Sequence, residues 1–255
     1  MVVGASFVST GLAAFAIRWL KNVQYWLLPG TCVLCRKPSG QRLDLCERCH
    51  AQLRFITTAC ATCALPLPAS GGPRCGHCLR QAAPFAQAIA PLMWAEPASQ
   101  LISQFKYQAR LAPGRVLGSL LVHELRLHYA GAQLPDLIVP VPLHPAKLRR
   151  RGYNQSLLLA RQLAQALDRP CSAKLLRRLR DTPQQQGLSR EERQHNLKGA
   201  FALNLREAAL HTSVRSIALV DDVVTTQSTA RELAQVLQQK LQPAPAIHLW
   251  ALARA

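Results

Sequence analysis

The chain has 255 residues, of which 49% are hydrophobic, and this content excludes an intrinsically disordered or fibrous protein. Its length suffices for one core with a small accessory unit, so one or two domains are expected. The 31 Lys and Arg residues exceed the 13 Asp and Glu residues by 18, which indicates a polyanionic partner such as nucleic acid or a phosphate-bearing ligand. The excess is concentrated in residues 1–80 and 147–198, which carry nine basic against two acidic and thirteen basic against four acidic side chains. Each zone is either a solvated basic face or a surface that tracks phosphates.

Residues 1–30 are predicted to form an N-terminal amphipathic helix. Its apolar stripe recurs at helical spacing and stops at Pro29 and Gly30. The stripe consists of Leu12, Phe15, Trp19, Val23 and Leu27. We expect this helix to pack on its own protein, with contact to a membrane or partner surface as the less favoured alternative. The start of the chain lacks the basic residue of a signal peptide and is short for a bilayer span.

Residues 31–82 are predicted to form a double zinc ribbon, because eight of the nine cysteines fall in four C-x-x-C pairs. The eight candidate zinc ligands are Cys32, Cys35, Cys46, Cys49, Cys60, Cys63, Cys75 and Cys78. Four thiolates make a closed structural zinc site, so two zinc ions are expected. A redox dithiol would need a pair at the start of a helix that follows a strand. Such cysteine usage indicates a reducing, cytoplasmic compartment.

The pairing of these cysteines into two sites has two solutions. Consecutive quartets require shorter loop closure than an interleaved arrangement, so they are favoured. His50 and His77 could each replace a neighbouring sulfur, but with eight cysteines present they are expected to be bystanders. Cys171 stands apart and is predicted to be a small core residue.

Residues 85–255 are predicted to form an α/β domain, because apolar strand-like runs alternate with amphipathic helical patterns. Strand-like runs cover residues 88–94, 137–141, 216–220 and 246–253. Helical patterns cover residues 99–108, 115–128, 155–167 and 228–239. This alternation indicates a parallel sheet flanked by helices. A short link through residues 82–84 separates it from the cysteine module.

The strongest site signal is the segment from Ser216 to Thr229, in which an apolar strand leads to an acidic pair, Asp221 and Asp222. Carboxylates at a strand end can accept hydrogen bonds from vicinal ribose hydroxyls, and they are the candidate catalytic residues. Hydroxyls and backbone amides at the start of the next helix can hold a phosphate. The candidate phosphate-binding residues are Thr225, Thr226, Gln227, Ser228 and Thr229. Ordinary strand-end capping would use the same residue types.

A second candidate element is the cationic segment after the strand at residues 137–141. It is interpreted as a basic loop suited to pyrophosphate, whose charge must be neutralised as it leaves. The candidate side chains are Lys147, Arg149 and Arg151. A solvated basic loop is the alternative, although the rigid Pro140-Val141-Pro142 approach favours a site.

The segment from Ser216 to Thr229 resembles the phosphoribosyl pyrophosphate motif of type I phosphoribosyltransferases. Further strings in the chain, together with the four C-x-x-C pairs, resemble the ComF/GntX family from Cys32 to the C-terminus. These strings are residues 105–107, 140–142, 151–155, 184–196 and 221–229. One departure is Gln227, which stands where the phosphoribosyltransferase motif has glycine. We expect this side chain to loosen phosphate binding, so that Gln227→Gly would tighten it.

The resemblance implies a double zinc ribbon joined to a type I phosphoribosyltransferase-like domain that binds phosphoribosyl pyrophosphate with Mg²⁺. It further implies a cytoplasmic protein associated with uptake of single-stranded DNA in natural transformation, with a competence helicase or recombination mediator as partner. A role in gluconate utilisation is implied by the GntX branch. Two classes of function stay open: a transferase whose acceptor is unidentified, and a non-catalytic protein that senses ligand or handles nucleic acid.

Overall fold

The computed structural model describes residues 30–181 and 197–255, and the described chain divides into two compact units between Gln52 and Leu53. The predicted N-terminal helix and the string at residues 184–196 lie outside the described residues. The second cysteine quartet falls in the same unit as the sheet, and the first quartet falls in the other. Among the described helices, none combines the length and apolarity that a membrane crossing requires.

The first unit, described from Gly30 to Gln52, is a small knuckle held by a few backbone hydrogen bonds. A bridge joins Thr31 to Pro38, and the N–H of Cys32 donates to the carbonyl of Lys37 at 2.8 Å. A single turn of helix, α2 (Glu47–His50), begins directly after Cys46. So short a segment buries little apolar surface, so its fold depends on a cross-link between the cysteines.

The second cysteine quartet repeats this local structure. A bridge joins Ala59 to Pro66, the N–H of Cys60 donates to the carbonyl of Leu65 at 2.8 Å, and α3 (Gly76–Arg80) begins directly after Cys75. In both halves the residue after the first C-x-x-C pair has a positive φ, 60° at Arg36 and 55° at Ala64. The two cysteine quartets, which have similar spacing in the sequence, therefore also share one local backbone structure.

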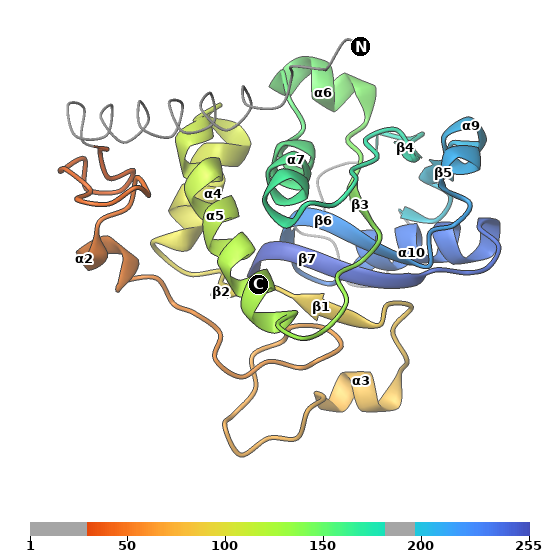
Figure 1. Ribbon diagram of the computed structural model, residues 1–255, viewed down its shortest axis with the longest axis horizontal. Helices are drawn as coiled ribbons and strands as arrows, with labels where there is room; N and C mark the ends of the chain where they lie inside the picture. Colours follow the sequence, from red (N-terminus) through yellow and green to blue (C-terminus); the bar gives the residue numbers. More distant parts are fainter. Residues whose placement is uncertain (1–29, 182–196) are drawn as a thin grey trace, which may run out of the picture. The chain divides into compact units, whose positions relative to one another are not determined.

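A parallel sheet forms the core of the second unit, as predicted. Its strands are β1 (Gln87–Ile89), β2 (Leu92–Met93), β3 (Leu137–Pro140), β6 (Ser216–Val224) and β7 (Ala246–Arg254). The order is β1-β7-β6-β3, with β2 also pairing β7, and all of these pairings are parallel. The central strands are buried on both faces, which explains their continuous apolar sequences (Figure 1).

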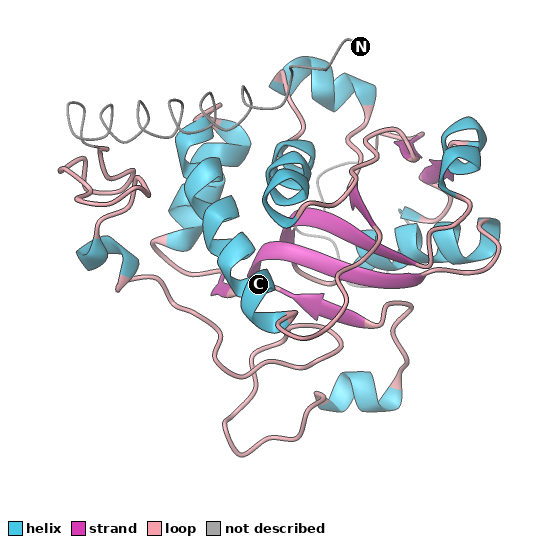
Figure 2. Ribbon diagram, in the orientation of Figure 1, coloured by secondary structure: helices cyan, strands magenta, loops and turns pink. Residues whose placement is uncertain are grey.

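Helices cover both faces of the sheet, which confirms the α/β fold class (Figure 2). The helices that pack on the sheet or on one another are α4 (Ala98–Tyr107), α5 (Leu111–His128), α7 (Gln155–Leu167) and α10 (Ser228–Lys240). Helix α7 packs on β3 and β6, and α5 packs on β7, α4 and α7. Leu233 and Leu237 of α10 share a core cluster with Leu219 and Leu249 of the central strands. The link at residues 82–84 is fixed to α10, because Gln238 Nε2 donates to the Pro84 carbonyl at 3.0 Å.

The basic segment after β3 is a helix, α6 (Pro145–Arg151), so the prediction of a loop was wrong. His144 caps its start by accepting the N–H of Ala146, and Pro145 occupies its first turn. Gly152 ends it at a φ of 84°, in the left-handed region that favours glycine. The arginines lie in the last turn, where positive charge complements the helix dipole.

Strand β6 is longer than predicted, which changes the placement of the acidic pair. It continues to Val224 because β7 extends alongside, with Val223 opposite Ala253 and Val224 opposite Arg254. Asp221 and Asp222 therefore lie within the strand rather than after its end.

Smaller elements complete the second unit. Strands β4 (Leu176–Arg178) and β5 (Phe201–Leu203) form a separate antiparallel pair, followed by α9 (Leu205–Ala208) and a 3-10 turn, η1 (Ala209–His211). The sequence pattern did not predict this pair. Strands of three residues are too short for a readable alternation, and the segment at 182–196 separates them in the chain.

Candidate functional site

The eight paired cysteines form two consecutive quartets, not an interleaved arrangement. Within each quartet the Sγ atoms all lie within 4.8 Å of one another. The Cys35 and Cys46 sulfurs are 3.8 Å apart, and the Cys63 and Cys75 sulfurs are 3.7 Å apart. A tetrahedral ion with Zn–S bonds of about 2.3 Å requires sulfurs about 3.8 Å apart, so both quartets fit zinc.

The second quartet is the more enclosed of the two, since all four of its cysteines are buried whereas Cys35 of the first is exposed. Backbone groups contact the sulfurs there: the N–H of Cys75 donates to Cys60 Sγ at 3.3 Å, and the N–H of Cys78 donates to Cys75 Sγ at 3.5 Å. Such donors orient ligands and stabilise negative sulfur.

Two histidines and the ninth cysteine, which the sequence places near or apart from the C-x-x-C pairs, lie outside both quartets. His50 and His77 belong to neither group of potential metal ligands among the described residues. Cys171 is only partly buried, at a parallel bridge with Ile138, so it is not the core residue that we predicted. Burial raises the pKa of its thiol, so it is a poor nucleophile.

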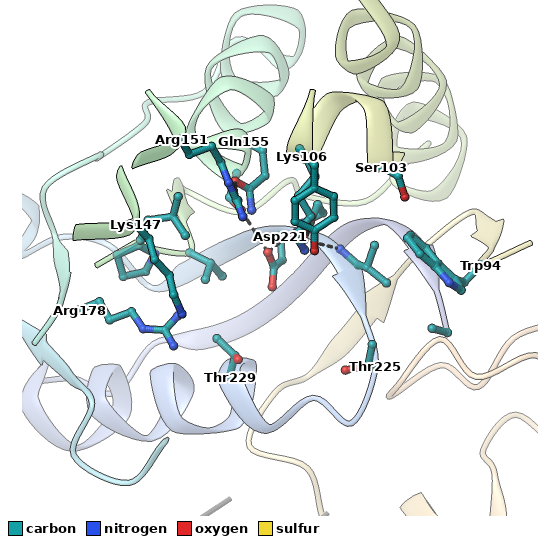
Figure 3. Close-up of a pocket in the computed structure, with 18 of the residues that line it drawn as sticks. Trp94, Ser103, Lys106, Lys147, Arg151, Gln155, Arg178, Asp221, Thr225 and Thr229 are labelled. Atoms are coloured by element: carbon teal, nitrogen blue, oxygen red, sulfur yellow. Dashed lines mark hydrogen bonds and ion pairs between the residues drawn. The ribbon is translucent and has the colours of Figure 1, made fainter. Parts of the chain in front are cut away.

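A cleft of about 470 Å³ opens at the carboxyl edge of the sheet, at the ends of β3, β6 and β7 (Figure 3). Its polar and charged lining includes Ser103, Lys106, Lys147, Arg150, Arg151, Gln155, Ser156, Arg178, Asp221, Asp222, Thr225 and Thr229. In an open parallel sheet this edge is where ligands bind. The cleft thus brings together both segments that the sequence singled out.

The two carboxylates of the acidic pair have different partners. Asp222 is buried, and its Oδ2 lies 2.7 Å from Lys106 Nζ at the end of α4. Asp221 is partly exposed at the centre of the cleft, and its Oδ1 accepts a hydrogen bond from Ser156 Oγ at 3.1 Å. The N–H of Asp222 donates to the same oxygen at 2.9 Å. Asp222 is therefore committed to a lysine, and Asp221 keeps acceptor capacity for a ligand.

The environment of Asp221 also alters its proton affinity. Burial, followed by the negative charge of Asp222, raises its pKa from 3.8 to about 7, and the positive charge of Lys106 offsets part of this rise. A carboxyl group poised near neutrality in a cleft is typical of a functional site.

The residues from Thr225 to Thr229 connect β6 to α10, and the helix begins at Ser228. All five line a second, small hollow of about 30 Å³, and Thr225 and Thr229 also line the main cleft. The hydroxyls of Thr226 and Ser228 lie 2.9 Å apart. Free N–H groups and the dipole at the start of a 13-residue helix suit a phosphate.

Gln227 adopts the left-handed conformation that glycine would provide, with φ 63° and ψ 7°. The turn therefore keeps its backbone shape even though the residue has a side chain, at a cost that glycine would avoid. That side chain points away from the turn, because its Nε2 donates to the carbonyl of Cys63 at 3.3 Å.

Helix α6 supplies much of the cationic wall of the cleft. Lys147, Arg150 and Arg151 line the cleft, whereas Arg149 is not among the lining residues. Helical geometry explains the difference, since positions three and four after Lys147 share its face and position two does not. Arg178 of β4 joins the same side of the cleft (Figure 3).

The string from Arg151 to Gln155 holds this wall in place. Tyr153 donates its hydroxyl to the carbonyl of Phe105 in α4, and their rings lie 6.0 Å apart. Asn154 caps α7 by accepting the N–H of Ser156, and its amide donates to the Val141 carbonyl at 3.1 Å. The string is therefore a junction between α6, α7 and the end of β3.

Several cleft residues were not assigned a role from the sequence. Lys106 belongs to the string at 105–107 that carried the resemblance, and only its distance to Asp222 reveals its role. Ser156 directly follows the string at residues 151–155, and Arg178 lies within a short basic run. Trp94 and Tyr107 form an aromatic side of the cleft, with exposed fractions of 40% and 57%. Tyr107 belongs to the string at residues 105–107, whereas no local motif marks Trp94.

Comparison with known proteins agrees with this architecture. A family model described as a double zinc ribbon domain matches residues 23–79. The chain is 38% identical over 231 residues to the DNA utilization protein YhgH of Escherichia coli K12, covering 89% of this chain and 98% of that protein. It is 36% identical over 230 residues to YhgH of Salmonella typhimurium, with the same coverages. It is 37% identical over 227 residues to Competence protein F of Haemophilus influenzae, covering 88% and 96%.

Proposed function

Because this chain belongs to the ComF family, as its similarity to Competence protein F along most of both sequences shows, we propose a role in DNA utilization, exercised through a cleft that binds phosphoribosyl pyrophosphate. The observation that carries the proposed ligand is the arrangement of Asp221, the turn at Thr225–Thr229 and the cationic face of α6 around one cleft. The carboxylate suits ribose hydroxyls, the turn suits a phosphate, and the cationic face suits a pyrophosphate.

Each part of the ligand has a named partner in this proposal. The 5′-phosphate binds the start of α10, where Thr225 and Thr229 face the cleft. The ribose hydroxyls donate to Asp221, since Asp222 is held by Lys106. The pyrophosphate lies against Lys147 and Arg151, whose charges neutralise it.

Mg²⁺ fits the same arrangement. This ion prefers oxygen ligands and is commonly held by one or two carboxylates together with substrate phosphates. The ionised carboxylate of Asp221 would hold it beside the pyrophosphate. The ion would neutralise charge on the leaving group.

Turnover would require the bond between the anomeric carbon and the pyrophosphate to break. Positive charge then develops on the ribose, and the nearby carboxylate of Asp221 stabilises it. The cationic wall stabilises the departing pyrophosphate. Among the described side chains that line the cleft, none is assigned as the base for an acceptor.

The basic surface supports contact with single-stranded DNA. The names of the relatives point to DNA utilization and competence, and residues 147–198 carry thirteen basic against four acidic side chains. Arg149, which does not line the cleft, is a candidate for phosphate contact outside it. A competence helicase or recombination mediator acting on the same strand is the proposed class of partner.

The test is a calorimetric titration with phosphoribosyl pyrophosphate and Mg²⁺, followed by an assay for released pyrophosphate. Binding with release on addition of an acceptor supports a transferase. Binding without release from any acceptor supports a ligand-sensing protein on the same fold. An absence of binding contradicts the proposed ligand.

A further inference from the structure

The turn between β6 and α10 is connected to a part of the chain far away in the sequence. Gln227 Nε2 donates to the carbonyl of Cys63 at 3.3 Å, and the two residues are 164 positions apart. Cys63 is one of the four cysteines of the second quartet. A side chain at the position that otherwise suits glycine thus joins the candidate phosphate turn to a candidate zinc ligand.

The second quartet is also packed against the sheet around this contact. Ala64, the residue after Cys63, is 1% exposed and belongs to the same core cluster as Leu233 of α10 and Leu249 of β7. Because the backbone on both sides of the hydrogen bond is fixed, the bond joins two ordered segments rather than a loop tip to solvent.

A second link lies at the end of β7. Arg254 donates from Nη1 to the carbonyl of Val224 at 3.1 Å, at the point where β6 leads into the turn. The same guanidinium lies within electrostatic range of all four cysteines of the second quartet. Four thiolates around one Zn²⁺ carry a net charge of about −2, so a bound metal site would attract this arginine.

We propose that Gln227 is a positioning residue that tethers the turn at Thr225–Thr229 to the second cysteine quartet, so that metal at the quartet and phosphate at the turn stabilise each other. This inference rests on the proposed function for the identity of the phosphate ligand. It also gives a reason for a glutamine at a left-handed position: the hydrogen bond compensates for the backbone conformation that glycine would adopt freely. Coupling between two sites is reciprocal, so each ligand must strengthen the binding of the other.

The first experiment needs no phosphate ligand. Gln227→Met keeps the length of the side chain and removes the donor, and Gln227→Gly removes the donor and the backbone cost together. Amide hydrogen exchange of Arg231, whose N–H donates to the Gln227 carbonyl at 2.8 Å, should quicken about fivefold in zinc-loaded Gln227→Met, since one neutral hydrogen bond is lost. Gln227→Gly should quicken it less, because relief of the left-handed backbone cost offsets part of that loss. The matched control is Gln238→Met. Gln238 also lies on α10, and its replacement removes the hydrogen bond from its side chain to the Pro84 carbonyl. This variant should leave the exchange rate unchanged.

The second experiment measures the coupling itself. In cadmium-113-substituted protein, the loss of metal to a chelator is followed by NMR separately for each quartet. Phosphoribosyl pyrophosphate should slow metal loss from the second quartet in the wild-type protein and in Gln238→Met, but not in Gln227→Met.

The outcomes separate this inference from the proposed function. Exchange at Arg231 that is equal in Gln227→Met and wild type overturns the tether. Faster exchange in Gln227→Met, combined with no effect of phosphoribosyl pyrophosphate on metal loss in the wild type, supports the tether and contradicts the proposed ligand. Slowing that is equal in wild type and Gln227→Met contradicts the coupling through Gln227.

Discussion

Asp221 and Asp222 are adjacent in the sequence, yet the structure gives them different electrostatic environments. Asp222 lies 2.7 Å from Lys106 and is shielded from solvent, and Asp221 faces the cleft with a pKa raised to about 7 by burial and by Asp222. Two carboxylates so close resist simultaneous ionisation, and Lys106 lies against Asp222 rather than Asp221. At the scale of single residues, this asymmetry makes Asp221 the titrating group of the site.

A pH dependence follows for ligand binding. A ribose hydroxyl donates to a carboxylate, so the affinity for phosphoribosyl pyrophosphate should increase as pH rises towards about 7, by up to about tenfold per pH unit, and then level off. Asp221→Asn should remove this component, and its comparison with wild type at each pH cancels the titration of the ligand itself. Parallel affinity curves for the two proteins would contradict the assignment.

The same shift predicts a pH dependence of stability with the opposite sign. The pKa of Asp221 in the folded protein lies above its ordinary value of 3.8, so the folded state holds the proton more tightly than the unfolded state. Its contribution to stability is complete below that ordinary value and is lost as pH rises towards about 7. In urea unfolding measured at several pH values, Asp221→Asn should remove this fall in the free energy of unfolding between pH 3.8 and about 7.

The ion pair between Lys106 and Asp222 predicts a large energetic coupling. Lys106→Met leaves a carboxylate that is 3% exposed without its partner, and should lower the free energy of unfolding by about 3 kcal/mol. This lies at the low end for a buried pair, because the lysine side chain is 25% exposed. Adding Asp222→Asn should recover part of the loss. Strictly additive single-variant effects in a double-mutant cycle would contradict the coupling.

Regular elements with strong periodicity could be predicted from the sequence. Helix α7 was predicted with the bounds that the structure has, because Asn154 caps its start and its apolar face is periodic. Strand β3 and the start of β6 follow from short apolar runs. The cysteine spacing likewise indicated two quartets, since each half repeats one local scheme.

What could not be predicted depends on contacts between distant segments. Helix α6 has no apolar periodicity and no fully buried residue, so its basic sequence looked like a loop despite Pro145 and Gly152 at its ends. The extra length of β6 exists because β7 continues beside it. The roles of Lys106 and Gln227 arise from partners more than one hundred residues away in the chain.

The cysteine quartets carry a prediction at the scale of elements. Protein purified without oxygen should contain two zinc ions per chain, and chelation should unfold residues 31–80 because the cysteine cross-links hold them. Cys171→Ser should leave the metal content unchanged, whereas Cys63→Ser and Cys35→Ser should each remove one ion. Elemental analysis that finds less than one zinc per chain in the wild type would contradict the metal sites.

The charge of the whole molecule predicts its behaviour towards nucleic acid. Single-stranded DNA should bind without strong sequence preference, and each neutralised phosphate should contribute about 0.7 to the slope of log affinity against log salt. Replacing Arg149, Arg150 and Arg151 with Ala should reduce this slope by up to about 2. The triple variant should also weaken phosphoribosyl pyrophosphate binding, whereas Arg149→Ala alone should affect only DNA, because Arg149 does not line the cleft. Fluorescence anisotropy that shows no oligonucleotide binding at low salt would contradict this account.

Binding of phosphoribosyl pyrophosphate at the acidic pair is the central claim, and one calorimetric comparison tests it most directly. Wild type and Asp221→Asn/Asp222→Asn are titrated with phosphoribosyl pyrophosphate and Mg²⁺, and circular dichroism verifies that the variant is folded. Hydrogen bonds to charged groups contribute about 1.5–3 kcal/mol each, so the double variant should bind about a hundredfold more weakly or not at all. An unchanged dissociation constant in the folded double variant would contradict the claim.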